Sequence, residues 1–448
     1  MFSKVTFCSL PWSSVQINPS GNFKICCFSG NDGNHGIAFD DSGKVMNVLT
    51  HSIEDAMNSE LHKELRLAQS RDERHPVCRV CWDKELAHAR QVVDSGHKAN
   101  IYNGVSHRIG RTFHHLVDEP NVVNIDNAAT AMRPDGSIDA MPIFLDIRFS
   151  NLCNAKCIQC EPQYSTLWYN DWVELNGTNK FNVGKVEYNL TKQGNKYVSD
   201  MPKWHDTPEW WAQFDRIKGR LRRIYVVGGE PFLQPAHDEM LDRLIAAGLA
   251  KDIELEYDTN LMAINNKILD RFSKFKKIHL AVSLDDTEKR YELIRFPSNW
   301  ERLNENLEKI KGLYNVSETR ISMCIGIFSV YAPTRVIPHF LDRGYKRFPI
   351  RLLRSPACYD MAWLPNDIKR KIIDSYDLID IPNRYKAETV GYLKNRMDQC
   401  SEETSERWMH SFVQRMDTLD KLRGTDWKGV MPDVVDILRG YYGSRLNL

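Results

Sequence analysis

Three cysteines in the stretch Asn151–Cys160 constrain this chain more than any other feature of its sequence. Cys153, Cys157 and Cys160 are separated by four and then by three positions. They follow directly on the apolar run Ile143–Phe149, which is typical of a buried strand. Thiolates are soft ligands that favour zinc, copper(I) or iron–sulfur clusters. Three of them leave a four-coordinate site one ligand short, and an open coordination position indicates a site that performs chemistry.

The same spacing also fits one face of a helix, where cysteine is a common small core residue. Asn151, Asn154 and Pro162 favour a loop instead, and Lys156 and Gln159 would make a poor apolar face. Metal binding is therefore the preferred interpretation of the three thiols.

The whole chain of 448 residues contains eleven cysteines, and five of them precede residue 82. The first twelve residues contain one lysine and no sustained apolar stretch, so a secretion signal is not expected. Without one, the cysteines do not indicate a disulfide framework, and the cytosol is the expected location. Lys and Arg total 60 against 59 for Asp and Glu, which gives no electrostatic case for nucleic acid or an anionic membrane. No apolar run approaches the roughly 20 residues that span a bilayer.

The N-terminal cysteines are placed to form a second site. A strong turn signal at 18–22 separates two short strand-like runs and predicts a β-hairpin that brings Cys8 towards Cys26. Cys78 and Cys81 form a C-x-x-C pair, whose two thiolates can point at one metal. With Cys26 or Cys27 as the remaining member, these residues supply four ligands.

A structural zinc ribbon and an iron–sulfur cluster both fit such a set, and unrelated buried cysteines are the third interpretation. Between the hairpin and the C-x-x-C pair, a short strand is expected around Lys44–Leu49 and a capped helix from Ser52 to about Gln69. The apolar content of this segment, 1–95, is modest, so a bound metal would add to its folding energy.

From Ile143 onward strand-like and helix-like segments alternate. The expected strands are 143–149, 223–227, 253–257, 277–284, 321–328 and 348–353, and the expected helices are 165–175, 208–218, 237–247, 264–275, 300–313, 335–343 and 366–376. This alternation predicts an α/β domain over 141–360 with a parallel sheet, either open and doubly wound or a partial (β/α) barrel. Both folds place chemistry at the carboxyl ends of the strands, where the three cysteines stand.

The remaining segments carry weaker signals. Residues 96–140 are expected to be an irregular linker. Residues 176–206, rich in Asn, Gly and Lys, are an insertion for which a surface loop is slightly preferred over a lid. Residues 361–448 carry helical patterns at 404–423 and 434–439, expected to pack on the barrel exterior or to close its open side.

Polar residues follow the later strands at the same rim. The turn Gly228-Gly229-Glu230-Pro231 has glycines that allow close approach of the backbone to a ligand, a carboxylate suited to an ammonium group and a proline that stiffens its exit. Thr259 and Asn260 stand at the end of the third strand, and Ser283 and Asp285 at the end of the fourth. Arg295 follows twelve residues after Ser283, and its guanidinium could clamp a carboxylate. Each is by itself more typical of a turn or cap, and their shared location at strand ends gives them weight.

Taken together, CNAKCIQC after the first strand, GGEP after the second, TN after the third and SLDD after the fourth resemble the radical S-adenosylmethionine (radical SAM) enzymes. The resemblance covers roughly residues 143–355 and implies a partial (β/α)₆ barrel. It also implies that Cys153, Cys157 and Cys160 hold three irons of a [4Fe–4S] cluster. The amino and carboxylate groups of S-adenosylmethionine (SAM) would chelate the fourth iron.

The same resemblance implies roles for the strand-end residues. Gly228, Gly229 and Glu230 would contact the amino end of SAM, and Ser283 and Arg295 would hold its carboxylate or ribose. The sequence departs from the family at Gln159, where an aromatic residue is usual. This departure weakens the expected packing against the adenine but leaves the ligation unchanged.

The N-terminal segment, with C-x-x-P-W, a strand, P-S-G, C-C and a later C-x-x-C, resembles the auxiliary-cluster module called twitch, which is related to SPASM. The resemblance implies a second, auxiliary [4Fe–4S] cluster on four cysteines, Cys8, Cys26, Cys78 and Cys81. By its distance from Gly21, Cys26 fits the ligand position better than Cys27. In most of that group the module follows the barrel, whereas here it precedes it.

The implied activity is that of an oxidoreductase or maturase that reductively cleaves SAM to a 5′-deoxyadenosyl radical. That radical abstracts hydrogen from a substrate, and the auxiliary cluster assists. A peptide or protein substrate and a flavodoxin- or ferredoxin-type electron donor are the implied partners, without membrane or nucleic acid. Two alternatives stay open: radical modification of a small molecule or nucleotide, and a zinc-stabilised α/β binding protein without radical chemistry.

Overall fold

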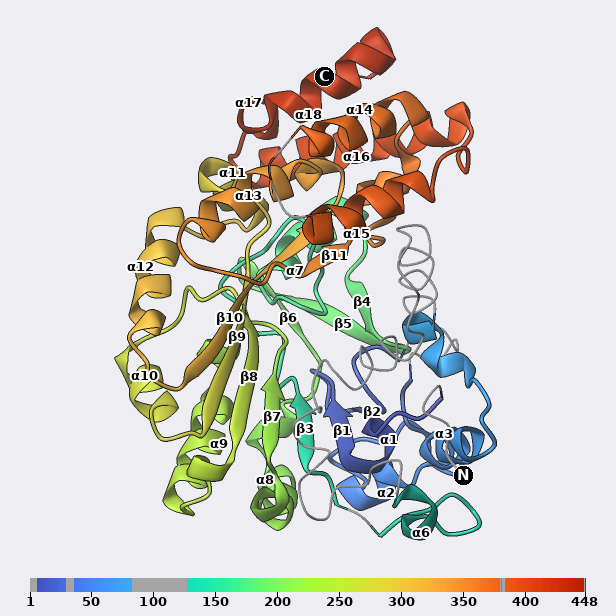
Figure 1. Ribbon diagram of the computed structural model, residues 1–448, viewed down its shortest axis with the longest axis vertical. Coiled ribbons are helices and arrows are strands. Elements are labelled where there is room, and N and C mark those ends of the chain that lie inside the picture. The colour runs from blue at the N-terminus through green and yellow to red at the C-terminus, as the bar shows by residue number, and fades with distance from the viewer. Residues whose placement is uncertain are drawn as a thin grey trace.

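The main sheet of the protein has eight strands in the order β11-β10-β9-β8-β7-β3-β1-β2 (Figure 1). This computed structural model describes residues 6–29, 36–82, 127–139, 141–378, 380, 383–446 and 448. Every neighbouring pair of strands is parallel except β1 with β2. The sheet therefore combines a parallel α/β core with one antiparallel hairpin at its edge.

Six of these strands form the predicted partial (β/α)₆ barrel. They are β3 (Phe144–Ile147), β7 (Arg223–Val226), β8 (Glu254–Thr259), β9 (Lys277–Ser283), β10 (Val316–Ile325) and β11 (Ile350–Leu352). Their order in the sheet follows their order in the chain, as successive crossovers through helices produce. β10 begins at Val316 rather than at Ile321, and ends before Gly326, where a short 3-10 turn follows.

Helices connect these strands and pack on the sheet. They are α7 (Trp168–Asn176), α8 (Pro208–Ile217), α9 (Pro235–Ala246), α10 (Asn266–Phe272), α11 (Glu288–Ile294), α12 (Trp300–Lys311) and α13 (Ala332–Leu341), of which only α11 was not expected. In α8, Thr207 caps the first turn, Pro208 takes the first position, and Trp210 and Phe214 recur on one buried face. Such faces join the strand side chains in one continuous hydrophobic core.

The N-terminal segment continues the barrel sheet beyond β3, which the sequence did not predict. After the short helix α1 (Leu10–Ser13), β1 (Ser14–Ile17) lies parallel to β3, with Ser14 opposite Phe144. β2 (Phe23–Lys24) returns antiparallel to β1, as the hairpin prediction required. This pairing places the N-terminal cysteines beside the barrel.

The hairpin turn forms through its asparagine and its glycine. The Asn18 carboxamide oxygen accepts hydrogen bonds from the backbone N–H groups of Ser20 and Asn22 at 3.0 Å each. Gly21 adopts φ of +83°, where a Cβ would lie 2.8 Å from the ring of Trp204. The turn is therefore specified both by φ and by contact with the barrel domain.

Two local expectations in this segment were wrong. The helix expected from Ser52 to Gln69 is two helices, α2 (Ile53–Met57) and α3 (Glu60–Ser70), although Ser52 does form the expected capping box. The strand expected around Lys44–Leu49 is replaced by isolated bridges, because Val45 pairs only with Phe39 and Asn47 only with Asn22. Of the expected linker, residues 96–126 and 140 lie outside the described residues, and residues 127–139 contain the short helix α6 (Ala128–Ala131).

The insertion at 176–206 is an antiparallel sheet, so the surface-loop interpretation was wrong. Its strands are β4 (Lys180–Val183), β5 (Val186–Gln193) and β6 (Lys196–Ser199). Their buried side chains Phe181, Val183, Tyr188 and Leu190 form a small separate core with Tyr169 of α7. The strands alternate between buried and exposed positions, and this alternation outweighs the loop-like composition.

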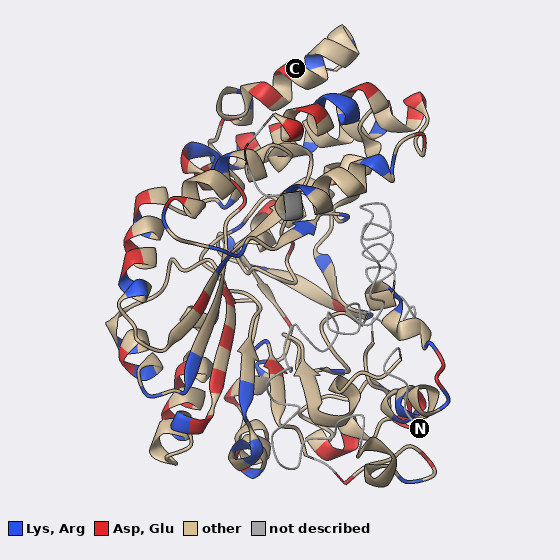
Figure 2. Cartoon of the chain, viewed as in Figure 1, with Lys and Arg blue, Asp and Glu red and all other residues tan. Residues whose placement is uncertain are grey.

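The C-terminal region is helical, as expected. It contains α14 (Asn366–Asp377), α15 (Asn383–Lys394), α16 (Glu402–Arg423), α17 (Trp427–Val430) and α18 (Pro432–Tyr442). In Figure 1 these orange and red helices gather at one end of the molecule, away from the N-terminal segment, and α16 packs on α7. Charged residues lie on these helices and also on the central strands (Figure 2). Among the described residues, no helix has the length and apolarity needed to cross a membrane.

Candidate functional site

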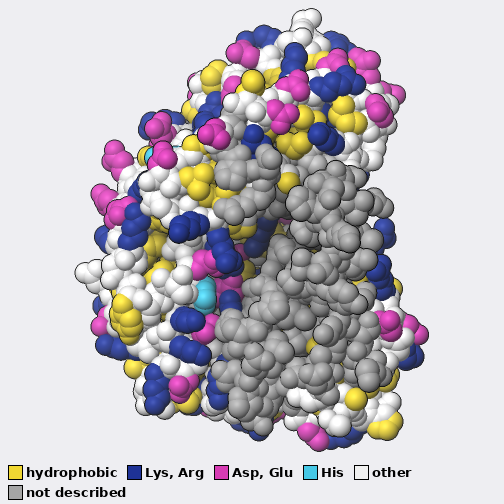
Figure 3. Space-filling model, viewed as in Figure 1, with side chains coloured by type: hydrophobic (Ala, Val, Ile, Leu, Met, Phe, Trp, Pro, Cys, Tyr) yellow, Lys and Arg dark blue, Asp and Glu magenta, His cyan; other side chains and the backbone are white. Residues whose placement is uncertain are grey.

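Both sets of cysteines line one cavity of about 650 Å³. These two sets are Cys153, Cys157 and Cys160 from the barrel and Cys8, Cys26, Cys27, Cys78 and Cys81 from the N-terminal segment, and Cys324 of β10 also lines the cavity. Basic and acidic side chains border the hollow at the middle of the face drawn in Figure 3. Of the expected strand-end residues, Gly228, Gly229, Glu230, Thr259, Asn260, Ser283 and Arg295 also line the cavity, whereas Pro231 and Asp285 do not.

The segment 151–160 is a loop, as predicted, and not a helix. It is fixed from several sides. Asn151 donates from its carboxamide to the carbonyl of Pro162 at 2.6 Å. The backbone N–H of Lys156 donates to the carbonyl of Phe296, just after α11, at 2.7 Å, and that of Ile158 donates to the carbonyl of Ile294, the last residue of α11, at 2.8 Å. Trp168 donates its indole N–H to the carbonyl of Cys157 at 2.9 Å. The loop is thereby held at the carboxyl end of β3.

The three thiols of this loop have strongly perturbed pKa values. Burial raises the pKa of Cys153 to about 12. Contact with Cys157, followed by burial, raises the pKa of Cys160. The hydrogen bond from Cys160 lowers the pKa of Cys157 to about 7, and the charge of Arg295 acts in the same direction. Iron would replace the thiol protons, since thiolates are the metal-binding form.

The donor set is suited to an iron–sulfur cluster. The three thiols come from one loop and line the same cavity. Iron–sulfur clusters are held by cysteine thiolates, each bound to a different iron. Among the described residues, no three His, Cys, Asp or Glu side chains converge on a single-ion site.

The two glycines of the GGEP turn lie against the cysteine loop. Gly228 and Gly229 have φ of +86° and +53°. A Cβ on Gly229 would lie 2.2 Å from the carbonyl oxygen of Leu152, and one on Gly228 would lie 2.8 Å from the Arg148 side chain. Glu230 donates its backbone N–H to the same Leu152 carbonyl at 2.8 Å. Glycine is therefore required here by both conformation and space.

Glu230 braces the ends of two strands. Its carboxylate is fully buried and accepts hydrogen bonds from the Thr259 hydroxyl at 2.6 Å and the Asn260 backbone N–H at 2.8 Å. Burial raises the pKa of Glu230 to about 7, against the hydrogen bonds that lower it. The sequence suggested that this carboxylate would receive an ammonium group. In the structure Glu230 lines the cavity, and its carboxylate also accepts the hydrogen bonds of Thr259 and Asn260.

Asn260 connects the end of β8 to the cysteine loop. Its carboxamide nitrogen donates to the Asn154 side chain at 2.7 Å and lies 3.9 Å from the sulfur of Cys153. Thr259 and Asn260 thus support the site from the third strand, the position that the sequence assigned to them.

Arg295 occupies the other side of the site. Its Nη2 lies 2.8 Å from Asp285 Oδ2, and its Nη1 lies 3.9 Å from Cys157 Sγ. Asp285 is fully buried and also accepts the backbone N–H of Cys324 at 2.6 Å. Asp285 therefore orients Arg295 instead of facing a ligand. Nε of Arg295 is buried without a hydrogen-bond partner among the described residues, so a donor remains for an anionic ligand group.

Gln159 is a site residue whose contacts the sequence did not predict. It lines the cavity and donates to Asp285 Oδ2 at 2.5 Å. Its Oε1 is buried with no partner among the described residues. The sequence signal that could have indicated a special role for Gln159 was its departure from the aromatic residue usual in the family at this position.

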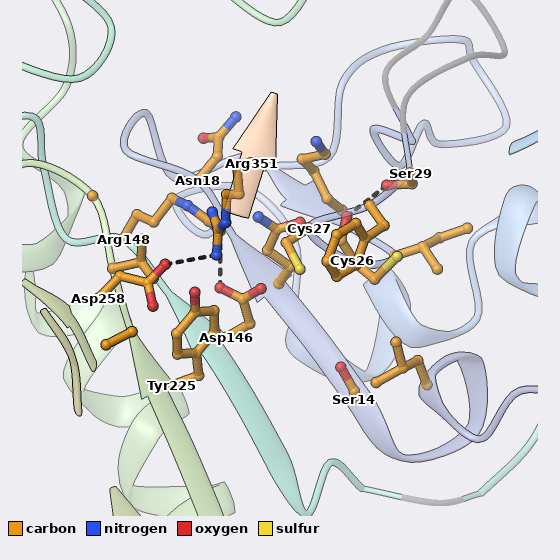
Figure 4. A pocket seen from close by; sticks show the side chains of 18 of the residues that line it. Ser14, Asn18, Cys26, Cys27, Ser29, Asp146, Arg148, Tyr225, Asp258 and Arg351 are labelled. Atoms are coloured by element: carbon orange, nitrogen blue, oxygen red, sulfur yellow. Dashed lines mark hydrogen bonds and ion pairs between the residues drawn. The ribbon is translucent and has the colours of Figure 1, made fainter. Parts of the chain in front are cut away.

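The two adjacent N-terminal cysteines face different surroundings. Figure 4 shows the sulfurs of Cys26 and Cys27 pointing apart. Burial, then the neighbouring Cys81, raises the pKa of Cys26 to about 11. Burial, then Asp146, raises the pKa of Cys27 well above its usual value. Cys26 therefore lies near Cys81 of the C-x-x-C pair, whereas Cys27 lies near Asp146 of β3.

Charged residues between the two cysteine sets were also missed. Asp146 pairs with Arg148 at 2.8 Å, and Asp258 of β8 pairs with Arg351 of β11 at 3.0 Å (Figure 4). Burial raises the pKa of Asp146 to about 6. The sequence did carry a signal for these charged residues. They occupy alternate positions of strands that are otherwise apolar, and alternate positions of a strand share a face.

Two family models match the chain. The radical SAM superfamily model matches residues 147–328, and the SPASM model, an iron–sulfur cluster-binding domain, matches residues 8–82. A search of curated proteins gives no match.

Solved structures give remote matches. SuiB from Streptococcus suis bound to S-adenosylmethionine is 13% identical, with 80% of this chain and 68% of that one covered and a TM-score of 0.34. SuiB bound to the precursor peptide SuiA is 12% identical, with 74% and 65% covered and a TM-score of 0.33. anSMEcpe with bound AdoMet is 17% identical, with 51% and 55% covered and a TM-score of 0.34. At these scores the overall likeness carries no functional argument.

Proposed function

Because the chain belongs to the radical SAM superfamily and carries a SPASM-type iron–sulfur domain, we propose that it is a SAM-dependent radical enzyme that modifies a peptide or protein segment. Members of the superfamily are enzymes, and the two matched domains imply a [4Fe–4S] cluster, SAM and further iron–sulfur binding. The family also disfavours the zinc-stabilised binding protein.

One observation carries the proposal: both cysteine sets open onto the same cavity of about 650 Å³. A substrate in that cavity would lie between the two sites. This arrangement supports a division of labour in which one site starts the radical chemistry and the other accepts or relays an electron.

The residues of the chain would hold the two clusters, orient SAM and shield the site from water. Cys153, Cys157 and Cys160 would ligate the first cluster and the four cysteines Cys8, Cys26, Cys78 and Cys81 the auxiliary one. When bound, the cluster and SAM together supply a 5′-deoxyadenosyl radical for hydrogen abstraction, chemistry that the cofactors and not the protein side chains provide. The backbone at 228–230 would receive the amino end of SAM, and Arg295 would offer its Nε to the carboxylate or ribose.

The charged cavity wall supports a polar substrate. Asp146, Arg148, Asp258 and Arg351 line the cavity between the two cysteine sets. Ion pairs there can exchange partners with the amide groups and side chains of a peptide, whereas an apolar substrate would leave them unsolvated. The electron donor we propose is a flavodoxin- or ferredoxin-type protein.

The test is anaerobic reconstitution followed by incubation with SAM and dithionite. We expect 5′-deoxyadenosine from the wild type and none from Cys153→Ala. Cys78→Ala should retain much of the uncoupled SAM cleavage while losing substrate turnover. A colourless protein that binds only zinc would overturn the proposal, and identical behaviour of the two variants would overturn the division of roles.

A further inference from the structure

The C-terminal helix α16 reaches the cysteine loop through its last residue, Arg423. The side chain of Arg423 is 1% exposed, and its Nε lies 2.8 Å from Asp171 Oδ2 on α7. The other carboxylate oxygen of Asp171 accepts Nζ of Lys156, also at 2.8 Å. Lys156 stands between Cys153 and Cys157 in the loop itself. One carboxylate thus joins the cysteine loop to a helix more than 250 positions later in the chain, since Asp171 and Arg423 are 252 apart.

A second connection runs through Trp168. The guanidinium carbon of Arg423 lies 4.7 Å from the centroid of the Trp168 ring. Trp168 is fully buried and donates its indole N–H to the carbonyl of Cys157. Arg423 therefore contacts the partners of two residues in the loop, Lys156 and Cys157.

The charges of this cluster do not balance. Lys156 and Arg423 contribute two positive charges and Asp171 one negative charge, so the group carries one net positive charge. Nη1 and Nη2 of Arg423 are buried and have no hydrogen-bond partner among the described residues. Burial removes water that would otherwise screen this charge, and the electrostatic effect on neighbouring groups is correspondingly larger. Arg423 lies in the last turn of α16, where the negative end of the helix dipole stabilises its positive charge.

We infer that Arg423 is a positioning residue of the SAM-binding cluster: it anchors the cysteine loop through Asp171 and Trp168, and the net positive charge that it gives this group favours the reduced state of the cluster. The inference rests on the proposed function. Reduction adds one negative charge to a thiolate-bound cluster, and a buried positive charge nearby stabilises that added charge. The C-terminal region would then belong to the reaction centre and not merely cover the barrel.

The test is a potentiometric titration of reconstituted protein. It is monitored by electron paramagnetic resonance, using the signal that changes when SAM is added. This response to SAM separates the relevant cluster from the auxiliary one. For Arg423→Met we expect the ratio of reduced to oxidised cluster at fixed potential to fall about tenfold, which corresponds to about 59 mV for a one-electron couple. Arg423→Lys keeps the charge and should stay close to the wild type.

Asp171→Asn gives the decisive comparison, because it removes the negative charge of the same group. It should shift the ratio of reduced to oxidised cluster upward, opposite to Arg423→Met. Damage to the fold alone would not produce shifts of opposite sign. Arg407→Met is the matched control, since Arg407 is an exposed arginine on the same helix, and its titration should match the wild type.

The outcomes separate the two claims. A wild type that assembles no iron or shows no SAM-responsive signal would overturn the proposed function. Suppose instead that the wild type shows that signal, but Arg423→Met and Asp171→Asn either titrate like the wild type or shift in the same direction. This result would overturn the role of Arg423 and leave the proposed function standing. If Arg423→Met fails to load iron, the other two variants still decide the question. The ratio of reduced to oxidised cluster should rise in Asp171→Asn and stay at the wild-type value in Arg423→Lys.

Discussion

The hydroxyl of Thr259 donates a hydrogen bond of 2.6 Å to the carboxylate of Glu230, and this buried bond joins the ends of β7 and β8. The backbone N–H of Asn260 adds a second bond to the same carboxylate. The buried carboxylate is therefore a structural link between two strand ends at which SAM is expected to bind.

The pKa of Glu230 makes the stability of this link pH-dependent. Burial raises it from 4.5 to about 7, so the folded protein binds this proton more tightly than the unfolded chain. The resulting stability is fully present below pH 4.5 and is lost as the pH rises through about 7. We expect the free energy of unfolding of the wild type to fall by about 3 kcal/mol over this range relative to Glu230→Gln, at 1.36 kcal/mol per pKa unit. Denaturant titrations at several pH values measure the difference in unfolding free energy between the two proteins. A difference that stays constant with pH would refute the raised pKa of Glu230.

Gly229→Ala should damage the site more than a comparable change elsewhere. Both Gly229 and Gly248 have positive φ, so alanine costs each about 1–2 kcal/mol of backbone strain. At Gly248 a Cβ would have no atom within 4 Å, whereas at Gly229 it would lie 2.2 Å from Leu152 O. We expect Gly229→Ala to weaken SAM binding at least about tenfold, or 1.4 kcal/mol, by equilibrium dialysis. Gly248→Ala is the control and should bind SAM like the wild type.

Arg295→Lys should weaken SAM binding without removing the positive charge. Lysine cannot reproduce the planar fork that meets Asp285 on one side and presents Nε on the other. Loss of a hydrogen bond to a charged group costs about 1.5–3 kcal/mol, which is roughly a 10- to 100-fold loss of affinity. Arg335→Lys is the matched control, because Arg335 pairs with the next residue, Asp286, and does not line the cavity. Equal losses in both variants would argue against a ligand contact by Arg295.

Cys26→Ser and Cys27→Ser should separate the two adjacent thiols. Cys26 lies with Cys81, whereas Cys27 faces Asp146. We therefore expect Cys26→Ser to lose the iron and acid-labile sulfide of one cluster, and Cys27→Ser to keep the content of the wild type. Iron and sulfide analysis after anaerobic reconstitution measures both. The reverse pattern would assign Cys27 as the ligand.

The sequence predicted the barrel and the places of its polar strand ends because both are local signals. Each strand is a short apolar run, and polar residues stand at its end, as Thr259 ends β8 and Asn260 follows it. In parallel sheets such ends meet at one edge, so Cys153, Glu230 and Arg295 could be grouped without coordinates.

The missed features are those that depend on distant partners. Nothing in the four residues of β1 specifies β3 as its neighbour, and Arg351 meets Asp258 only because the barrel curves β11 back towards β8. Lys156, Asp171 and Arg423 are likewise ordinary surface-type residues in sequence, and folding alone brings them together in the interior. Residues 176–206 were misjudged for a different reason, since their Asn- and Gly-rich composition outweighed the alternation of Phe181 and Val183.

The pairing of β1 with β3 also bears on biosynthesis. Ser14 is aligned with Phe144, so β1 emerges from the ribosome 130 positions before the strand that it adjoins. Until then it presents an unpaired edge, which is a hazard for aggregation. Insertion of iron into the N-terminal cysteines during translation would hold this hairpin in shape while the barrel is completed. The order of synthesis would then make cluster assembly a folding step, and iron-starved cells should accumulate insoluble chain as well as inactive enzyme.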